Sequence, residues 1–201
     1  MKTHGTIRAV VAIVALLAGG TVARTDTNPV YATRIAAVAN NSFLVKADGT
    51  AWACGANNYG QIGDGTSGTN RVVAVQVSGL SGVTNISAGA VHAVALKSDG
   101  NLWAWGGNWQ GQLGFGPDGN LHPIPVQVSG ISDVKTIAVG YQYNFALKSD
   151  GSLWHWGDYA SAPHPTPADT GIAGVSQVAC GNNTKFVVKG DGTVWGWGVN
   201  Y

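Results

Sequence analysis

The residues of this chain that could do chemistry are few and lie singly along the sequence. The aspartates divide between four Asp-Gly pairs, where the side chain stabilises a turn, and isolated loop positions. No pair of carboxylates recurs at a spacing that suggests acid–base work, and no serine lies in a Gly-x-Ser-x-Gly elbow. The string GGNWQG lacks a following lysine and a predicted helix, so it is not a phosphate loop. We therefore expect no catalytic residue and no enzyme activity.

Histidine and cysteine add little to this chemistry. His92 could act as a base, although a histidine at such a position more often bonds to backbone. The two cysteines, Cys54 and Cys180, form no Cys-x-x-Cys motif, and the sequence has neither a histidine cluster nor metal-ligand spacing. We expect no metal and no cofactor. Whether Cys54 and Cys180 pair stays open, because a disulfide is permitted only if the protein is exported.

Side chains that suit binding lie in the connections between apolar segments. Tyr59 and Trp109 stand in glycine-rich loops, and three otherwise similar segments diverge at 90–92, 141–143 and 182–184. Varying side chains on a constant backbone are how a rigid scaffold builds a binding face, and tyrosine gives large contact area at small entropy cost. The alternative is that these residues are ordinary loop residues without a role in binding. The candidate partner-binding residues are Tyr141, Tyr143, Trp109, Tyr59, His92 and Asn182.

The elements that position these residues repeat along the chain. Asp-Gly pairs recur at steps of 51, 51 and 41 residues, each followed by an apolar run with tryptophan, at 48–49, 99–100, 150–151 and 191–192. Alternating and β-branched residues before and after each pair predict strands, and Asp-Gly between two apolar runs predicts a hairpin with a type I′ turn. Gly89, Gly140 and Gly181 separate two short strands, which predicts a bend or a close backbone approach. Each unit is thus an antiparallel sheet of three or four strands, the size of a propeller blade.

The long motif from Ala88 to Gly116 identifies the repeat. It reads AGAVHAVALKSDGNLWAWGGNWQGQLGFG and resembles the repeat of the regulator-of-chromosome-condensation family, recurring in whole or part over 35–201. The resemblance, to an exported bacterial type of this family, implies an all-β fold, a β-propeller that usually has seven blades. We expect three to four blades here, over 35–82, 83–133, 134–174 and a truncated 175–201. The 41-residue step arises because the third repeat has SAPHPTPAD in place of the Gly-Gln-Leu-Gly loop.

An incomplete ring would leave strand edges unpaired. The arc could close with fewer blades, pair with another copy, or belong to a longer chain. The last motif breaks off at Asn200-Tyr201, which favours a fragment of a longer propeller.

Tryptophan beside glycine predicts a packing device between blades. The two tryptophans of Trp-x-Trp-Gly point to the same face of a strand, so the pairs should pack against the next blade, with glycine allowing close approach. These pairs are Trp103/Trp105, Trp154/Trp156 and Trp195/Trp197, while Cys54 replaces the second tryptophan in the first repeat. Gln61 and Gln112 are expected to bond to the backbone of their loops. An exposed sugar-binding platform is the alternative role for the tryptophans.

The N-terminus predicts export. Lys2 and Arg8 precede a short apolar run at 9–18, and small residues follow, as in a signal peptide. We expect a signal peptide over 1–23, with cleavage after Ala23 or alternatively Ala32, and a linker over 24–34. The run is too short to span a membrane, so we expect no integral membrane span after cleavage. The protein would then be secreted or lie in the cell envelope, and an uncleaved N-terminal anchor is the alternative.

These observations predict an exported, non-enzymatic binding module that contacts an unknown protein partner through its blade loops. A formal net charge of +1 with only 10% charged residues gives no basis for nucleic-acid binding. Secreted propellers of the resembled family include β-lactamase inhibitors, which supports the analogy. A carbohydrate-binding surface protein is the alternative, and guanine-nucleotide exchange, which gave the family its name, is less favoured because its GTPase is intracellular.

Overall fold

The computed structural model describes residues 32–157 and 164–198. These residues form fifteen strands and no helix. The strands build four antiparallel sheets, so the expected all-β propeller architecture is confirmed. The predicted signal peptide, its cleavage after Ala23 and most of the linker lie outside the described residues.

Each sheet is one blade, and its strands follow one another in chain order. Blade 1 contains β1 (Ala32–Val38), β2 (Asn41–Lys46), β3 (Ala51–Gly55) and β4 (Arg71–Gln76). Blade 2 contains β5 (Val83–Ala88), β6 (His92–Lys97), β7 (Leu102–Gly107) and β8 (Leu121–Gln127). Blade 3 contains β9 (Val134–Val139), β10 (Asn144–Lys148), β11 (Leu153–Trp156) and the short β12 (Ala168–Asp169). Blade 4 has three strands, β13 (Val175–Cys180), β14 (Thr184–Lys189) and β15 (Val194–Gly198).

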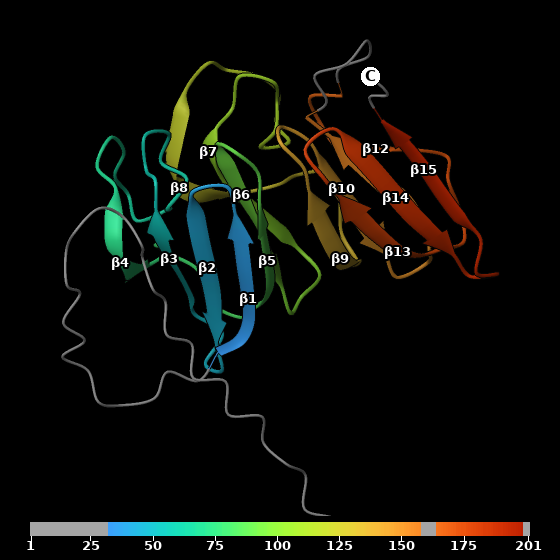
Figure 1. Cartoon of the computed structure of the whole chain (residues 1–201), viewed down its shortest axis with the longest axis horizontal. Coiled ribbons are helices and arrows are strands. Elements are labelled where there is room, and N and C mark those ends of the chain that lie inside the picture. Colours follow the sequence, from blue (N-terminus) through green and yellow to red (C-terminus); the bar gives the residue numbers. More distant parts are fainter. Residues whose placement is uncertain (1–31, 158–163, 199–201) are drawn as a thin grey trace, which may run out of the picture.

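The four blades pack face to face in sequence order (Figure 1). The first strand of each blade contacts the first strand of the next: β1 lies against β5, β5 against β9, and β9 against β13. These strands therefore form the inner edge of the arc, while β4, β8 and β12 are outer edges.

The Asp-Gly hairpins form at all four predicted places, but their turn type differs from the expected type I′. In the first hairpin the Gly49 amide donates to the Lys46 carbonyl at 3.0 Å and the Lys46 amide donates to the Thr50 carbonyl at 2.9 Å. The loop thus has three residues, and only the third, Gly49, has a positive φ, of 78°. This is a type I turn followed by a glycine bulge. Asp48 accepts hydrogen bonds from the Thr50 hydroxyl at 2.6 Å and from the Thr50 amide at 2.9 Å, which fix the turn and lower the pKa of the carboxyl group.

Three apolar clusters fill the spaces between the blades. One cluster joins blades 1 and 2 and contains Phe43 and Trp105, whose rings meet edge to face with centroids 6.4 Å apart. The second joins blades 2 and 3 and contains Trp156, and the third joins blades 3 and 4. Trp105 and Trp156 are fully buried, as expected for interblade packing.

The direction of the tryptophan packing is opposite to the one predicted. The Trp105 indole N–H donates to the carbonyl of Gln61 in blade 1 at 2.9 Å, and that of Trp156 donates to Gln112 in blade 2 at 3.0 Å. Each tryptophan therefore packs against the preceding blade and not the next. Strand alternation fixes that the pair shares a face, but the handedness of the arc decides which neighbour that face meets.

Glycine after Trp-x-Trp is required by the backbone of the neighbouring turn. Gly106 has a φ of 108°, and a Cβ atom there would collide with the Val91 carbonyl oxygen. We expect Gly106→Ala to lower the free energy of unfolding by at least about 2 kcal/mol, from strained φ and steric overlap. Gly190→Ala is the matched control, because the nearest atom to its Cβ would be 3.7 Å away. Urea denaturation of both variants measures this difference, and equal midpoints would contradict the assigned clash.

Candidate binding face

The candidate binding residues lie at one end of the blades because of the antiparallel strand order. In blades 1 to 3 the connection from the first strand to the second and the connection from the third to the fourth emerge at the same end, where the first connection of blade 4 also lies. We call this end the turn face; it comprises 39–40, 89–91, 140–143, 181–183 and the long loops 56–70 and 108–120. The Asp-Gly hairpins lie at the opposite end, the hairpin face.

The two long loops of the turn face are built on the same hydrogen bonds. Gln61 accepts a bond from the Tyr59 amide at 2.8 Å, and Gln112 accepts one from the Gln110 amide at 2.7 Å. Buried Asn57 and Asn108 each accept a backbone amide five residues further on, at 3.1 and 3.0 Å. The prediction that Gln61 and Gln112 bond to loop backbone is confirmed. These bonds fix both loops without using their exposed side chains.

Tyr59 and Trp109 come together across two blades. Their rings meet edge to face with centroids 5.1 Å apart, and they are 39 and 38% exposed. They do not occupy equivalent positions, since Tyr59 corresponds to Gln110 by its hydrogen bond to the following glutamine. The sequence therefore could not show that they touch. An exposed aromatic pair on an ordered loop offers a large contact area with little loss of entropy on binding.

Tyr141 and Asn182 lie nearer the inner edge of the same face. Tyr141 is 48% exposed, and Asn182 is also exposed. Both border a hollow of about 170 Å³ where the inner strands of all four blades end. Other residues around it are Val38, Ala90, Val139 and Cys180. The Ala90 amide donates to the Tyr141 carbonyl at 3.1 Å, which ties the turns of blades 2 and 3 together.

His92 is enclosed between blades 2 and 3 and has no exposed surface. Its Nε2 lies 2.8 Å from Asn144 Oδ1, and because an amide oxygen only accepts, the imidazole Nε2–H donates. Asn144 in turn donates to the Gln112 carbonyl at 2.8 Å. Burial lowers the pKa of His92 to about 4, although the bond to Asn144 opposes this shift. His92 thus ties two blades together in its neutral form.

Tyr143 is also buried, at 6% exposure, and its hydroxyl lies 2.8 Å from the Gly181 carbonyl and 3.0 Å from that of Thr184. It therefore joins blade 3 to blade 4. The expected partner-binding set thus separates into exposed Tyr59, Trp109, Tyr141 and Asn182 and interior His92 and Tyr143. Sequence differences between the repeats could not separate the exposed residues from the interior ones. A side chain between two blades changes with the residues that it packs against, so it varies between repeats as much as a side chain at the surface does.

Two acidic loop residues, Asp64 and Asp118, form ion pairs and hydrogen bonds that stabilise their own loops. Asp64 pairs with Arg71 across the first long loop, and Asp118 lies 2.8 Å from His122 in the second. Burial raises the pKa of Asp118, but hydrogen bonds from Asn120, His122 and Asn108 outweigh it and lower the value to about 2. Within 32–157 and 164–198, no three histidine, cysteine or acidic side chains gather as a closed metal site would require. Cys54 and Cys180 are free thiols, and burial raises the pKa of Cys180 to about 12.

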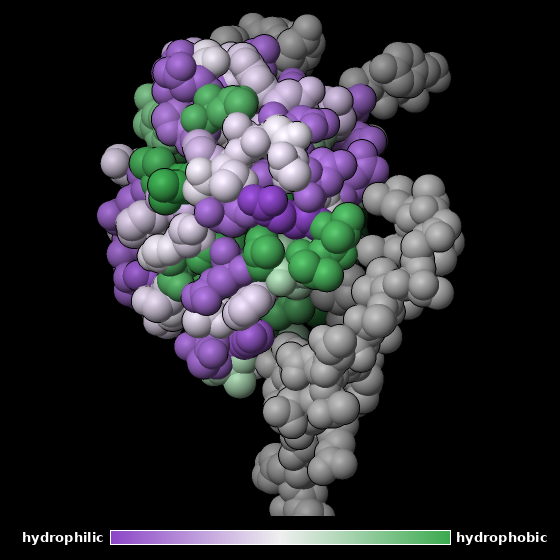
Figure 2. Space-filling model, turned by 90° about the vertical axis from the view of Figure 1, so that its left-hand side faces the viewer, coloured by the Kyte–Doolittle hydropathy of each residue, from purple (hydrophilic) through white to green (hydrophobic). Residues whose placement is uncertain are grey.

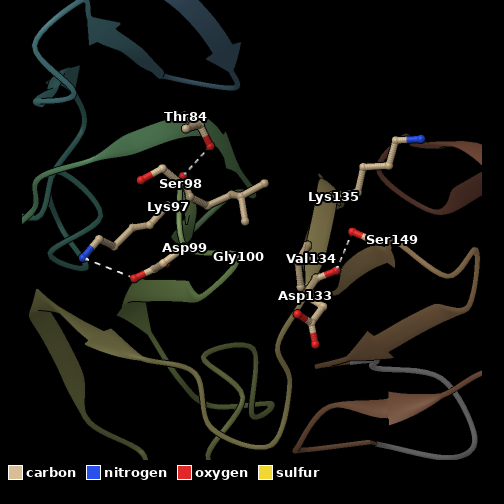
Figure 3. A pocket seen from close by; sticks show the side chains of 10 residues that line it. Thr84, Lys97, Ser98, Asp99, Gly100, Asp133, Val134, Lys135 and Ser149 are labelled. Atoms are coloured by element: carbon tan, nitrogen blue, oxygen red, sulfur yellow. Dashed lines mark hydrogen bonds and ion pairs between the residues drawn. The ribbon is translucent and has the colours of Figure 1, made fainter.

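A second hollow, of about 410 Å³, lies on the hairpin face between blades 2 and 3 (Figure 3). Its charges largely compensate one another: Lys97 reaches toward Asp99, with 3.9 Å between Nζ and a carboxylate oxygen, while Lys135 and Asp133 lie on the other side. Asp133, directly before β9, has a positive φ of 59°, where glycines with φ of 67° and 68°, Gly82 and Gly174, precede β5 and β13. No single motif indicated this hollow, since its residues come from separate repeats.

Comparison with known proteins agrees with this architecture. A model of the Regulator of chromosome condensation (RCC1) repeat matches residues 48–96 and 99–147, and a second model of the same repeat matches 32–61 and 83–112. Together they cover 32–147, more than half of the chain. Human Protein RCC2 is 33% identical over 132 residues, which are 63% of this chain and 25% of that protein. Ultraviolet-B receptor UVR8 of Arabidopsis thaliana is 32% identical over 127 residues, 61% of this chain and 28% of that protein.

Not all relatives with these repeats share one activity. Mouse E3 ubiquitin-protein ligase HERC2 is 30% identical over 132 residues, but these are only 3% of its length. This chain thus spans about a quarter of RCC2 and UVR8 and far less of HERC2.

Solved structures show the same fold. Prp20p of Saccharomyces cerevisiae, in a structure whose description names binding to Gsp1p and histones, aligns with a TM-score of 0.74 at 22% identity, over 87% of this chain and 47% of that one. Yeast RCC1 (Prp20) bound to Kap60 aligns with a TM-score of 0.73, over 86% of this chain and 45% of that one. With its four sheets, its repeated turns and the matches to both repeat models, the chain belongs to the RCC1 repeat family and has the fold of the RCC1 β-propellers.

Proposed function

We propose that this protein is exported and binds another protein through its turn face, without catalysing a reaction. The observation that carries the proposal is the exposed Tyr59–Trp109 pair, held edge to face at 5.1 Å on two hydrogen-bonded loops. Tyrosine and tryptophan dominate binding energies at protein interfaces. The yeast propeller relative is described with protein partners, Kap60, Gsp1p and histones, which supports a protein as the class of ligand.

The inner part of the turn face extends the proposed contact surface. Exposed Tyr141 and Asn182 border the 170 Å³ hollow, which is wide enough to receive a protruding side chain of the partner. Its walls carry no charged residue: most are apolar side chains and backbone, and Asn182 adds a neutral polar side chain. A partner side chain seated here would therefore be uncharged, since the walls offer no counter-ion.

Partner binding is tested by affinity capture from the extracellular fraction of the native source, followed by titration of the purified pair. We expect Tyr59→Ala combined with Trp109→Ala to raise Kd at least about 30-fold, as for interface hot spots. Lys135→Ala is the control, because Lys135 is exposed beside the hollow of the hairpin face, at the opposite end of the blades (Figure 3). Val72 is unsuitable although it is 68% exposed, because it directly follows the first long loop of the turn face, on β4 (Figure 1) at the side of the molecule that Figure 2 shows. An unchanged Kd in the double variant, or an equal loss in the control, would contradict the assignment.

Export is tested by N-terminal sequencing of the protein recovered from the culture medium or cell envelope. We expect the mature chain to begin at Arg24, or at Thr33 if cleavage follows Ala32. Recovery of the uncleaved chain from the cytoplasm would refute export. In 32–157 and 164–198 the structure contains no helix with the length and hydropathy needed to cross a membrane.

Carbohydrate binding is the second candidate, because Trp195 is 56% exposed and its flat ring could stack on a sugar. Lys189 lies over this ring, 5.2 Å from its centroid, and competes for the face. A glycan array with hits that vanish in Trp195→Ala would favour this candidate over protein binding. Guanine-nucleotide exchange ranks lower, and acceleration of nucleotide release from a small GTPase would restore it.

A further inference from the structure

Two histidines of blade 3 lie side by side. His155 is on β11 and His164 lies shortly before β12. Their ring centroids are 4.4 Å apart and the ring planes are tilted by 55°. Both residues are half-buried. Their spacing along the chain matches no metal-ligand motif, so the sequence did not indicate that they meet.

Two departures from the repeat bring these imidazoles together. The residue between the two aromatic positions of the Trp-x-Trp element is alanine in blades 1 and 2, but it is His155 in blade 3. His164 corresponds to His122 of blade 2, because both begin a His-Pro-x-Pro segment. In blade 2 the ring of His122 meets Asp118 and Phe115 of the second long loop. The third repeat has no such loop sequence, and there His164 meets the second histidine instead.

The backbone holds both histidines in place. His155 pairs with Phe145 across β10 and β11, and their rings stack with centroids 5.9 Å apart and planes 16° apart. The His164 carbonyl accepts a hydrogen bond from the Gly157 amide at 2.7 Å, and the carbonyl of the next residue accepts one from the Gly116 amide at 3.0 Å. Ligands that the fold positions in advance lose little entropy when an ion binds.

The distance between the two rings indicates which kind of ion they suit. Imidazole nitrogen is a ligand for zinc, copper and nickel. With metal–nitrogen bonds of about 2.0 Å, two imidazoles at a right angle have centroids about 4.5 Å apart, whereas a tetrahedral angle gives about 5.2 Å. The observed 4.4 Å matches the right angle, which is the geometry of tetragonal Cu²⁺. Because the χ2 torsion of histidine is soft, a small rotation turns one nitrogen of each ring toward a common point.

We propose that His155 and His164 bind one Cu²⁺ ion, with one nitrogen of each imidazole as a ligand. Among first-row divalent ions, copper binds nitrogen ligands most tightly. In 32–157 and 164–198 no third histidine, cysteine or acidic side chain joins the pair, so water completes the coordination and the ion is exchangeable. This inference does not depend on the proposed function, because the Tyr59–Trp109 pair belongs to the loops of blades 1 and 2.

Titration of the purified chain with copper(II) chloride tests the proposal, with calorimetry for the Kd and electron paramagnetic resonance for the ligands. We expect one tightly bound Cu²⁺ per chain, with two nitrogen ligands in its spectrum. His155→Ala and His164→Ala should each raise the Kd at least about 30-fold, since losing even a group that only orients a ligand costs about 10–100-fold. Alanine already stands at the first of these positions in blades 1 and 2, so the fold should be kept, and circular dichroism checks this.

His122→Ala is the matched control, because His122 has the same repeat position in blade 2 but lies 2.8 Å from Asp118 and not beside a second histidine. Its Kd for Cu²⁺ should equal that of the unaltered chain. An unchanged Kd in His155→Ala or His164→Ala, an equal loss in His122→Ala, or a spectrum with a single nitrogen ligand would each overturn the proposal. Tight binding that survives both substitutions would place the ion elsewhere, at the terminal amine or another histidine, and would overturn it as well.

Discussion

Replacing Trp105 with alanine is expected to lower the free energy of unfolding by about 3–5 kcal/mol, the usual cost of removing a buried tryptophan. Trp105 is fully buried between blades 1 and 2, and its ring packs edge to face on Phe43. Its indole N–H also satisfies the carbonyl of Gln61 at 2.9 Å. The substitution would leave a cavity and a buried acceptor without its partner, and these costs add.

Trp195→Ala is the control, since Trp195 is the first tryptophan of the same motif in blade 4 and is 56% exposed. Its loss should cost less than about 1 kcal/mol, because little apolar surface leaves water there. Urea denaturation followed by circular dichroism compares the two variants. Similar midpoint shifts for both would mean that tryptophan burial between blades does not stabilise the fold.

Acidification from pH 6.5 to 4 is expected to remove about 3 kcal/mol of stability through His92 alone. Burial lowers the pKa of this histidine from 6.5 to about 4, so in this range the unfolded chain binds a proton that the native chain does not. Stability is therefore fully present above pH 6.5 and declines as the pH falls toward 4. The aspartates of the hairpins also have lowered pKa values, and their contribution to stability is lost as the pH falls below about 5, so a variant is needed to separate the His92 contribution.

His92→Asn isolates this contribution, because Asn41 stands at the same position in blade 1, where it donates to the Ala56 carbonyl at 2.6 Å. The variant loses some stability at pH 7, but its stability should vary less between pH 6.5 and 4. The difference between the two curves of unfolding free energy against pH gives the contribution of His92. Parallel curves would show that His92 titrates normally and is not enclosed as described.

Much of the fold followed from the sequence because local rules agreed with the tertiary structure. The Asp-Gly pairs specified four hairpins, since glycine alone accepts the positive φ that each loop needs. Gly89 was expected at a close backbone approach, and a Cβ there would collide with the Gly140 carbonyl. Gln61 and Gln112 bond to their loops as expected because an amide side chain beside a tight turn finds backbone partners nearby.

Properties that depend on neighbouring blades could not be predicted from one repeat. Tyr143 and His92 are of residue types that often lie at the surface, but here they are buried between blades. Tyr59 contacts Trp109 only because the curvature of the arc brings their loops together. Trp195 and Trp197 share the motif of Trp105 yet are 56 and 38% exposed. Exposure at these positions is set by the neighbour that each blade meets, which the motif does not encode.

Hydrogen exchange of the tryptophan indole N–H groups, observed by NMR on the ¹⁵N-labelled chain, tests the stacking of blades most directly. The chain has eight tryptophans, so their indole signals can be followed individually. Trp105 and Trp156 should exchange slowest, because their indoles are buried and donate to carbonyls of the preceding blade. Rapid exchange at these two positions, at the rate of half-exposed Trp109 and Trp195, would contradict the interblade packing on which the fold and the binding face depend.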